Sequence, residues 1–131
     1  MVATKMKKID DLNHSRELGK KGEEIAVAYL VKKGYKLLHR NWHFGHKELD
    51  IVTSYNGMLV VVEVKTRWTN YWEEPKESVR RKKQRFIIDA AEEYVQHYNL
   101  NMDVQFDVIS IVLQGNSHEL EHIEDAFQPN F

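Results

Sequence analysis

Residues 48–65, ELDIVTSYNGMLVVVEVK, contain two runs of aliphatic and β-branched residues on either side of the dipeptide Asn56-Gly57. Such runs favour β-strands, and an Asn-Gly pair between them is typical of a two-residue hairpin loop, because both loop positions need a positive φ. We therefore expect Tyr55 to pair with Met58 next to the loop. Moving away from the loop, the preceding residue of the first strand then pairs with the following residue of the second, so Ser54 pairs with Leu59 and Thr53 with Val60. The other expectations for the site depend on this register.

The register places four ionisable side chains on one face of the hairpin. Asp50 is expected opposite Glu63, and Glu48 opposite Lys65, because side chains alternate along a strand. Opposed Cβ atoms lie about 4.5–5.5 Å apart, so the two carboxylates would repel each other and one pKa would rise unless a cation lies between them. The alternative is a solvated hairpin end with an exposed Glu48–Lys65 pair. The valine-rich run before Glu63 favours a divalent-metal site instead.

At 131 residues, the chain is long enough for one domain with a substantial core. It contains no cysteine, which excludes disulfides, thiolate metal sites and a cysteine nucleophile. No apolar run approaches the ~20 residues that span a membrane, and the N-terminus lacks the apolar segment of a signal peptide. We therefore expect a cytoplasmic protein without a membrane partner.

The net charge of −1 conceals a separation of charge along the chain. Residues 1–47 and 75–91 carry an excess of lysine and arginine, whereas neither residue type occurs after position 91. The basic segments leave room for a surface that faces phosphate. The alternative is that these charges lie on solvated helix faces.

Hydrophobic spacing predicts a helix from about Ser15 to Lys33 and a second helix from Ser78, as its N-cap, to about Tyr98. Strands are expected over residues 35–43, 104–113 and 118–123, in addition to the two hairpin strands. Both faces of the hairpin are apolar, so we expect a central strand pair that is covered on both sides. The predicted order is α-β-β-β-α-β-β, with a flexible lead-in at 1–14, a single domain at 15–127 and a tail at 128–131.

Glu23 lies at the margin of the apolar face of the first predicted helix, in a row with Gly19, Ala26 and Leu30. A carboxylate among small and apolar neighbours is half-buried and can point across at a neighbouring sheet. An ordinary glutamate at the boundary of the helix face is the alternative.

The loop after Lys65 carries Trp68, Tyr71 and Trp72 beside Arg67. Because this loop follows the hairpin directly, it is expected to overhang the predicted site. Aromatic rings with a nearby arginine can stack on nucleic-acid bases, and the alternative is that they pack the loop down.

Residues 118–122, HELEH, match the zinc-protease motif H-E-x-x-H. That motif binds zinc when it lies on a helix, where two histidines four residues apart share a face. Here it follows a Gly-Asn turn and has the alternating pattern of a strand, so we do not expect a zinc site.

A wider set of motifs resembles the YraN-like family of small bacterial proteins. These motifs are Gly19-x-x-Gly22-Glu23-x-x-Ala26-x-x-Tyr29-Leu30, Gly34-Tyr35, Arg40-Asn41, Glu48-Leu49-Asp50, Glu63-Val64-Lys65-Thr66-Arg67, Lys83-Gln84, Ala90-Ala91 and Phe106-Asp107-Val108. The family looks like a branch of the PD-(D/E)XK nuclease superfamily and is similar to archaeal Holliday-junction resolvases. One departure is local, because Lys47 precedes Glu48 where the family more often has glycine.

The resemblance implies an α/β fold with a restriction-endonuclease-like α-β-β-β-α-β core, a mixed central sheet flanked by helices and a C-terminal edge strand. It also implies a DNA substrate and Mg²⁺ or Mn²⁺. The site residues that it implies are Asp50 and Glu63 as metal ligands, Lys65 as the catalytic lysine, Glu23 as an acid from the first helix and Lys83 as a basic residue from the second. To these we add the Val64 carbonyl as a metal ligand, Gln84 and Arg67 as substrate-binding residues beside Lys83, and Glu48 as a supporting acid opposite Lys65.

These expectations describe a magnesium-dependent endodeoxyribonuclease that acts on DNA, including branched or processed structures. Resolvase-like cleavage of two strands would need a homodimer. The alternative is a non-catalytic nucleic-acid-binding or scaffold protein that retains the nuclease fold. A protein-interaction module is a third reading.

Overall fold

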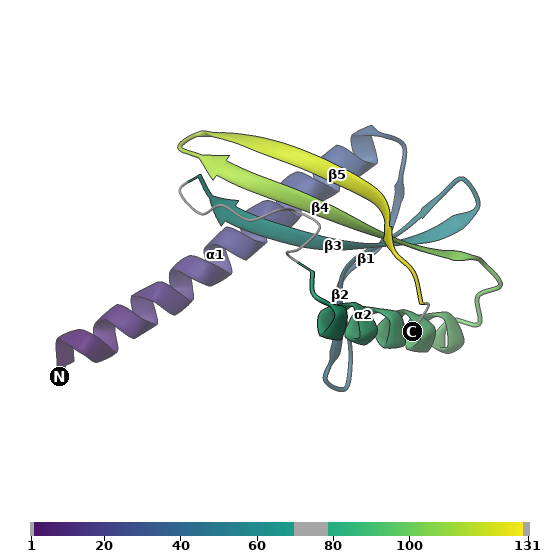
Figure 1. Ribbon diagram of the computed structural model, residues 1–131, viewed down its shortest axis with the longest axis horizontal. Coiled ribbons are helices and arrows are strands. Elements are labelled where there is room, and N and C mark those ends of the chain that lie inside the picture. The colour runs from purple at the N-terminus through teal and green to yellow at the C-terminus, as the bar shows by residue number, and fades with distance from the viewer. Residues whose placement is uncertain (1, 70–78, 130–131) are drawn as a thin grey trace.

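A computed structural model describes the backbone of residues 2–69 and 79–129, with side chains from residue 15 onward. Its elements are α1 (Val2–Lys32), β1 (Lys36–Phe44), β2 (Lys47–Tyr55), β3 (Met58–Trp68), α2 (Arg81–His97), β4 (Val104–Gln114) and β5 (Ser117–Phe127) (Figure 1). The predicted order α-β-β-β-α-β-β is confirmed. Within the described ranges, neither helix is both long and apolar enough to cross a membrane.

The five strands form one mixed sheet in the order β1-β2-β3-β4-β5. Strands β3 and β4 are parallel, and every other neighbouring pair is antiparallel. A parallel pair needs a crossover connection, and α2 lies in the segment that joins β3 to β4. The C-terminal strand β5 is an edge strand, as predicted.

Both faces of the central hairpin are buried, which confirms the prediction from its apolar pattern. One cluster packs Ala26 and Leu30 of α1 against Ile51 and Val62. A second cluster on the α2 side of the sheet includes Val52, Leu59, Val61, Phe106, Val108, Ile87, Ala90, Ala91 and Tyr94. The two helices therefore cover opposite faces of the sheet, while the N-terminal part of α1 projects beyond the sheet (Figure 1).

The hairpin loop has the predicted geometry. Asn56 and Gly57 have φ angles of 51° and 77°, and Tyr55 pairs with Met58. Positive φ at both positions is the condition that a type I′ turn imposes.

The two helices begin at different residues than predicted. Helix α1 begins at Val2 rather than near Ser15, and the flexibility of residues 1–14 remains a prediction. Helix α2 begins at Arg81, with Arg80 as an N-cap whose side chain makes no capping hydrogen bond. The prediction that Ser78 is the N-cap of this helix is therefore wrong. Ser78 lies outside the described residues, as do Tyr71 and Trp72 of the predicted aromatic loop. The third aromatic residue of that prediction, Trp68, is the last residue of β3, so the loop does not begin directly after Lys65.

Candidate functional site

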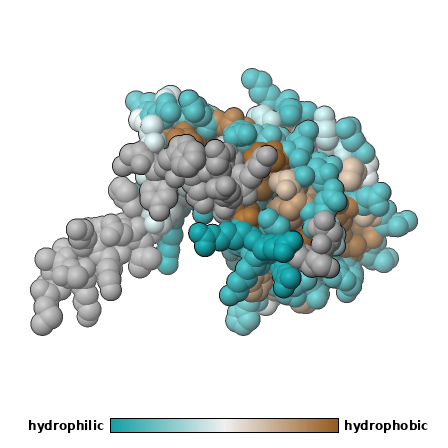
Figure 2. Space-filling view, viewed as in Figure 1, coloured by the Kyte–Doolittle hydropathy of each residue, from teal (hydrophilic) through white to brown (hydrophobic). Residues whose placement is uncertain are grey.

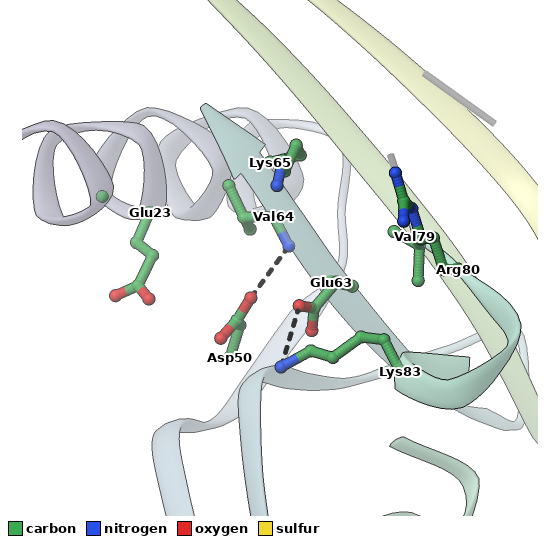
Figure 3. A pocket seen from close by; sticks show the side chains of 9 residues that line it. Glu23, Asp50, Glu63, Val64, Lys65, Val79, Arg80 and Lys83 are labelled. Carbon is green, nitrogen blue, oxygen red and sulfur yellow. Dashed lines mark hydrogen bonds and ion pairs between the residues drawn. The ribbon is translucent and has the colours of Figure 1, made fainter. Parts of the chain in front are cut away.

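The ladder between β2 and β3 follows the predicted register from Tyr55–Met58 to Ile51–Val62 and ends there. The expected next pair, Asp50–Glu63, is not part of the ladder. Instead, Oδ2 of Asp50 accepts a hydrogen bond of 3.0 Å from the backbone N–H of Val64 (Figure 3). A side-chain carboxylate thus takes a place that a backbone carbonyl would fill in a regular ladder, and this corrects the strict pairing inferred from the sequence.

Strand β2 also loses its regular alternation at this point. Leu49 packs in the α2-side cluster with Val52, although alternation would place it with Ile51 on the other face. On the neighbouring strand, Asn41 lies between the residues paired with Ile51 and Leu49 and has a left-handed φ of 49°. The Asp50 carboxylate that accepts the Val64 hydrogen bond lies at this break in the alternation.

The expected pair between Glu48 and Lys65 is wrong. Glu48 pairs with His43 of β1, and its carboxylate Oε1 lies 3.8 Å from the His43 imidazole Nε2. Lys65 is exposed and lines an open pocket. Its ammonium group is therefore not tied to the acid that was expected to fix it.

Glu63 is the most strongly perturbed acid of the site. Its side chain is 12% exposed, and its Oε1 lies 3.7 Å from Nζ of Lys83 in α2 (Figure 3). Burial raises the pKa of Glu63 well above its usual range, and the negative charge of Asp50 raises it further, while Lys83 lowers it. Because the Glu63 and Asp50 carboxylates are near enough to interact, the pair favours the binding of a proton or a cation.

Glu23 reaches the same region from α1. Its Oε2 accepts a hydrogen bond of 3.0 Å from the side-chain amide of Asn41. Burial raises the pKa of Glu23, the Asn41 hydrogen bond lowers it, and the charge of Asp50 raises it. The prediction that Glu23 points across at the sheet is confirmed by this contact with β1.

The approach of α1 to β3 depends on a glycine next to Glu23. A Cβ added to Gly22 would overlap the side chain of Thr66 in β3. The absence of a side chain lets the helix backbone lie directly against the strand, which carries Glu23 to the end of the pocket.

These side chains surround an open pocket of about 610 Å³ (Figure 3). The residues that line it are Gly19, Glu23, Asp50, Glu63, Val64, Lys65, Val79, Arg80 and Lys83. The structure therefore brings together three predicted acids and two predicted lysines from α1, β2, β3 and α2. Arg80 adds a cation that the sequence reading did not single out, and strongly hydrophilic side chains gather over this end of α2 (Figure 2).

Two predicted substrate-binding residues lie elsewhere. The side chain of Gln84 turns back, and its Nε2 donates a hydrogen bond of 2.9 Å to the Val79 carbonyl. Arg67 is buried in β3. Neither residue lines the pocket.

The donor set of the pocket is oxygen-only. Among the described residues, no group of three or more His, Asp or Glu side chains is arranged to hold a metal ion. Asp50 and Glu63 do supply two carboxylates. An extended strand points the N–H and C=O of one residue to the same side, so the Val64 carbonyl is directed toward β2, as its N–H is. Two carboxylates and one carbonyl suit Mg²⁺, which commonly keeps water or phosphate oxygens as its other ligands.

A second polar cluster joins β4, β5 and α1. The fully buried carboxylate of Asp107 accepts hydrogen bonds from Gln105 and from the backbone N–H of Asp125, and its Oδ2 lies 2.7 Å from Nε2 of His122. The other ring nitrogen of His122 lies 3.0 Å from the Tyr29 hydroxyl. This cluster was not predicted from the sequence, although Asp107 inside the apolar run of β4 was a signal for it.

The histidine motif lies on strand β5, as its alternating pattern predicts. His118 is exposed, whereas the His122 side chain is buried against Asp107. The two rings therefore have different surroundings, and the helical geometry of a zinc-protease motif is absent from this part of the described chain.

Comparisons with known proteins place the chain in a family. The model of the uncharacterised protein family UPF0102 matches residues 22–111, a span that contains all the acids and lysines of the pocket. The chain is 47% identical to a UPF0102 protein of Phocaeicola vulgatus over 113 residues, which cover 86% of this chain and 93% of the relative. It is 44% identical to one of Parabacteroides distasonis over 111 residues, with 85% and 92% covered. It is 46% identical to one of Porphyromonas gingivalis over 111 residues, with 83% and 82% covered.

Proposed function

The chain belongs to the UPF0102 family, the YraN-like family that its motifs resemble, and we propose that it is a divalent-metal-dependent endonuclease that hydrolyses phosphodiester bonds in DNA. The observation that carries the proposal is the meeting of Asp50, Glu63 and Lys65 in one open pocket. This is the arrangement of acids and lysine that the PD-(D/E)XK resemblance implies. The pocket is open to solvent, so an extended polymer backbone can reach it.

Asp50, Glu63 and the Val64 carbonyl would hold Mg²⁺ or Mn²⁺. When bound, such an ion stabilises negative charge on a phosphate and lowers the pKa of bound water. Burial of Glu63 beside Asp50 supports this assignment, because a cation offsets both the burial of the charge and the repulsion by Asp50, which together raise the pKa of Glu63.

Lys65 would orient the attacking water or neutralise the charge that develops on the phosphate. Its exposed ammonium group lines the pocket and is not tied to Glu48. Positioned charges of this kind stabilise the transition state because they need little reorganisation. Glu23 of α1 accepts a hydrogen bond from Asn41, and its carboxylate would hold a water molecule on the α1 side of the pocket.

Arg80 and Lys83 would bind the phosphates next to the cleaved bond. Both line the pocket at the start of α2. Phosphate binding by such residues is sequence-independent and weakens as salt is added. We therefore expect a preference for DNA structure rather than for base sequence.

The test is cleavage of a panel that contains four-way junctions, flaps, single strands and duplexes, with Mg²⁺ or Mn²⁺ and with chelator. We expect metal-dependent cleavage that is lost in Asp50→Ala and Lys65→Ala and kept in Lys82→Ala, whose side chain does not line the pocket. Absence of cleavage by the wild type, or undiminished cleavage by both site variants, would overturn the proposal.

Gel shifts on the same panel test the rival function, a DNA-binding or scaffold protein. That rival predicts binding that survives Asp50→Ala and falls steeply with salt, without cleavage. A protein-interaction module predicts no shift at low or physiological salt.

A further inference from the structure

We propose that Lys83 acts as an exchangeable counter-ion of Glu63. The lysine side chain must move away before a divalent cation binds to Glu63, and it is then available to a DNA phosphate. This inference rests on the proposed metal site and adds a coupling between the metal and the substrate. It assigns Lys83 two alternating partners, a carboxylate in the metal-free protein and a phosphate in the complex.

The first observation is the ion pair itself. Nζ of Lys83 lies 3.7 Å from Oε1 of Glu63, and the two side chains point toward each other across the pocket (Figure 3). Oε1 belongs to one of the two carboxylates that would bind the metal. A lysine ammonium group and a divalent ion therefore compete for the same oxygen.

The second observation is the difference in burial between the two partners. The Glu63 side chain is 12% exposed, whereas that of Lys83 is 52% exposed. The carboxylate is held in the sheet, while the lysine has a long flexible stem in contact with solvent. Lys83 can therefore leave without any change in β3, and the cost of leaving is small because partly exposed ion pairs are weak.

The third observation separates Lys83 from the other cations of the pocket. Lys65 and Arg80 line the same pocket, but the ion pair found for Glu63 within the described residues is the one with Lys83. Lys65 and Arg80 can thus face a phosphate whether or not metal is bound. Lys83 alone among the three changes its partner.

A thermodynamic consequence follows. A phosphate that attracts Lys83 removes the competitor from Glu63 and so strengthens metal binding, and by reciprocity the metal strengthens phosphate binding by the same factor. Metal-free protein would bind DNA weakly because Lys83 remains with Glu63. The pocket would thus be completed only when both ligands are present.

The test measures Mn²⁺ affinity by titration calorimetry in the absence of DNA. Lys83→Met is compared with the wild type and with Lys82→Met, which removes the same charge from the adjacent position of α2 but not from the pocket. We expect Lys83→Met to bind Mn²⁺ about two- to fivefold more tightly than the wild type, in line with loss of a partly exposed ion pair. Lys82→Met should stay within about twofold of the wild type, because screening weakens more distant charges.

A second measurement tests the coupling through binding of a four-way junction with and without Ca²⁺, used as a probe ion in place of Mg²⁺. Ca²⁺ should increase the affinity of the wild type for DNA, and the increase should be smaller in Lys83→Met. Equal Mn²⁺ affinities for all three proteins, or equal tightening in both lysine variants, would overturn the inference and leave the nuclease proposal standing. Tighter Mn²⁺ binding by Lys83→Met without any cleavage by the wild type would support the exchange and reject the nuclease. Absence of Mn²⁺ binding in every variant would overturn both the exchange and the metal site.

Discussion

The side-chain amide of Asn41 donates a hydrogen bond of 3.0 Å to Oε2 of Glu23, and Asn41 itself has a φ of 49°. The left-handed region is unfavourable for most residues, although asparagine tolerates it better than others. Glycine would adopt this backbone conformation but has no side-chain amide to donate to Glu23. Asn41 thus combines a left-handed backbone conformation within β1 with a side chain that holds an acid of the pocket.

This combination can be separated by two substitutions. Asn41→Gly keeps the backbone conformation and removes the amide, whereas Asn41→Ala removes the amide and strains the backbone. We expect Asn41→Gly to lower the cleavage rate with little loss of stability, and Asn41→Ala to be less stable than Asn41→Gly by about 1 kcal/mol. Urea unfolding and single-turnover cleavage measure the two effects. Full activity of Asn41→Gly would show that the amide does not act through Glu23.

Asn41→Gly should also change the pH dependence of cleavage. The Asn41 hydrogen bond lowers the pKa of Glu23, which burial raises, so that its removal raises the pKa further. If activity needs the ionised carboxylate, the acid limb of the pH–rate profile moves to higher pH in Asn41→Gly. An unchanged acid limb would show that Glu23 does not have to be ionised for cleavage.

The contact between α1 and β3 makes Gly22 a sensitive position. A Cβ at Gly22 would overlap the Thr66 side chain, whereas a Cβ at Gly19 would meet nothing within contact distance. We expect Gly22→Ala to destabilise the protein by about 1–3 kcal/mol, as overpacking does. The matched control Gly19→Ala should be neutral or stabilising, because alanine is the better helix former. Urea unfolding measures both variants.

A double-mutant cycle identifies the cause of the Gly22→Ala effect. If overlap with Thr66 is responsible, Gly22→Ala should cost much less in a Thr66→Gly background than in the wild type. An equal cost in both backgrounds would contradict the close approach of the helix to the strand.

Much of the fold follows from local patterns. The Asn56-Gly57 loop and its register could be predicted because a two-residue turn fixes which residues pair next to it. The burial of both hairpin faces could be predicted because apolar residues occupy both sets of alternating positions. These features depend on residues that are close in sequence.

The break at Asp50 could not be predicted in the same way. It involves the Val64 N–H of β3 and lies opposite Asn41 of β1, and both come next to Asp50 only after the sheet has formed. Helix α2 likewise starts after Arg80 without a side-chain cap, so the preference of serine for that position was a misleading guide. At Asp50, a contact between distant segments overrides the local pairing preference.

Glu63→Gln should stabilise the metal-free protein at neutral pH. The pKa of Glu63 is raised in the folded state, so its contribution to stability is fully present below its unfolded pKa of about 4.3 and is lost as the pH rises through the folded pKa. Glutamine has no such titration. The melting temperature of Glu63→Gln should therefore exceed that of the wild type by a margin that grows as the pH rises above about 4.3.

Divalent metal should reverse this order. Mg²⁺ or Mn²⁺ should raise the melting temperature of the wild type, because a ligand that binds only the folded state stabilises it. Glu63→Gln should respond much less, and added chelator should remove the effect in both proteins. A wild type that is more stable than Glu63→Gln at pH 8 in chelator would contradict the assigned repulsion between Glu63 and Asp50.

The two histidines of the HELEH segment provide the last prediction. His118 is exposed, while the His122 side chain is 4% exposed and its Nε2 lies 2.7 Å from the fully buried carboxylate of Asp107. His122→Leu would leave that carboxylate without one partner, so we expect a loss of about 2–4 kcal/mol in the free energy of unfolding. His118→Leu is the matched control and should change stability by less than about 0.5 kcal/mol. A zinc site would instead make both substitutions lower the free energy of unfolding and would make that free energy depend on chelator. Equal losses in the two variants would therefore support zinc binding by this motif.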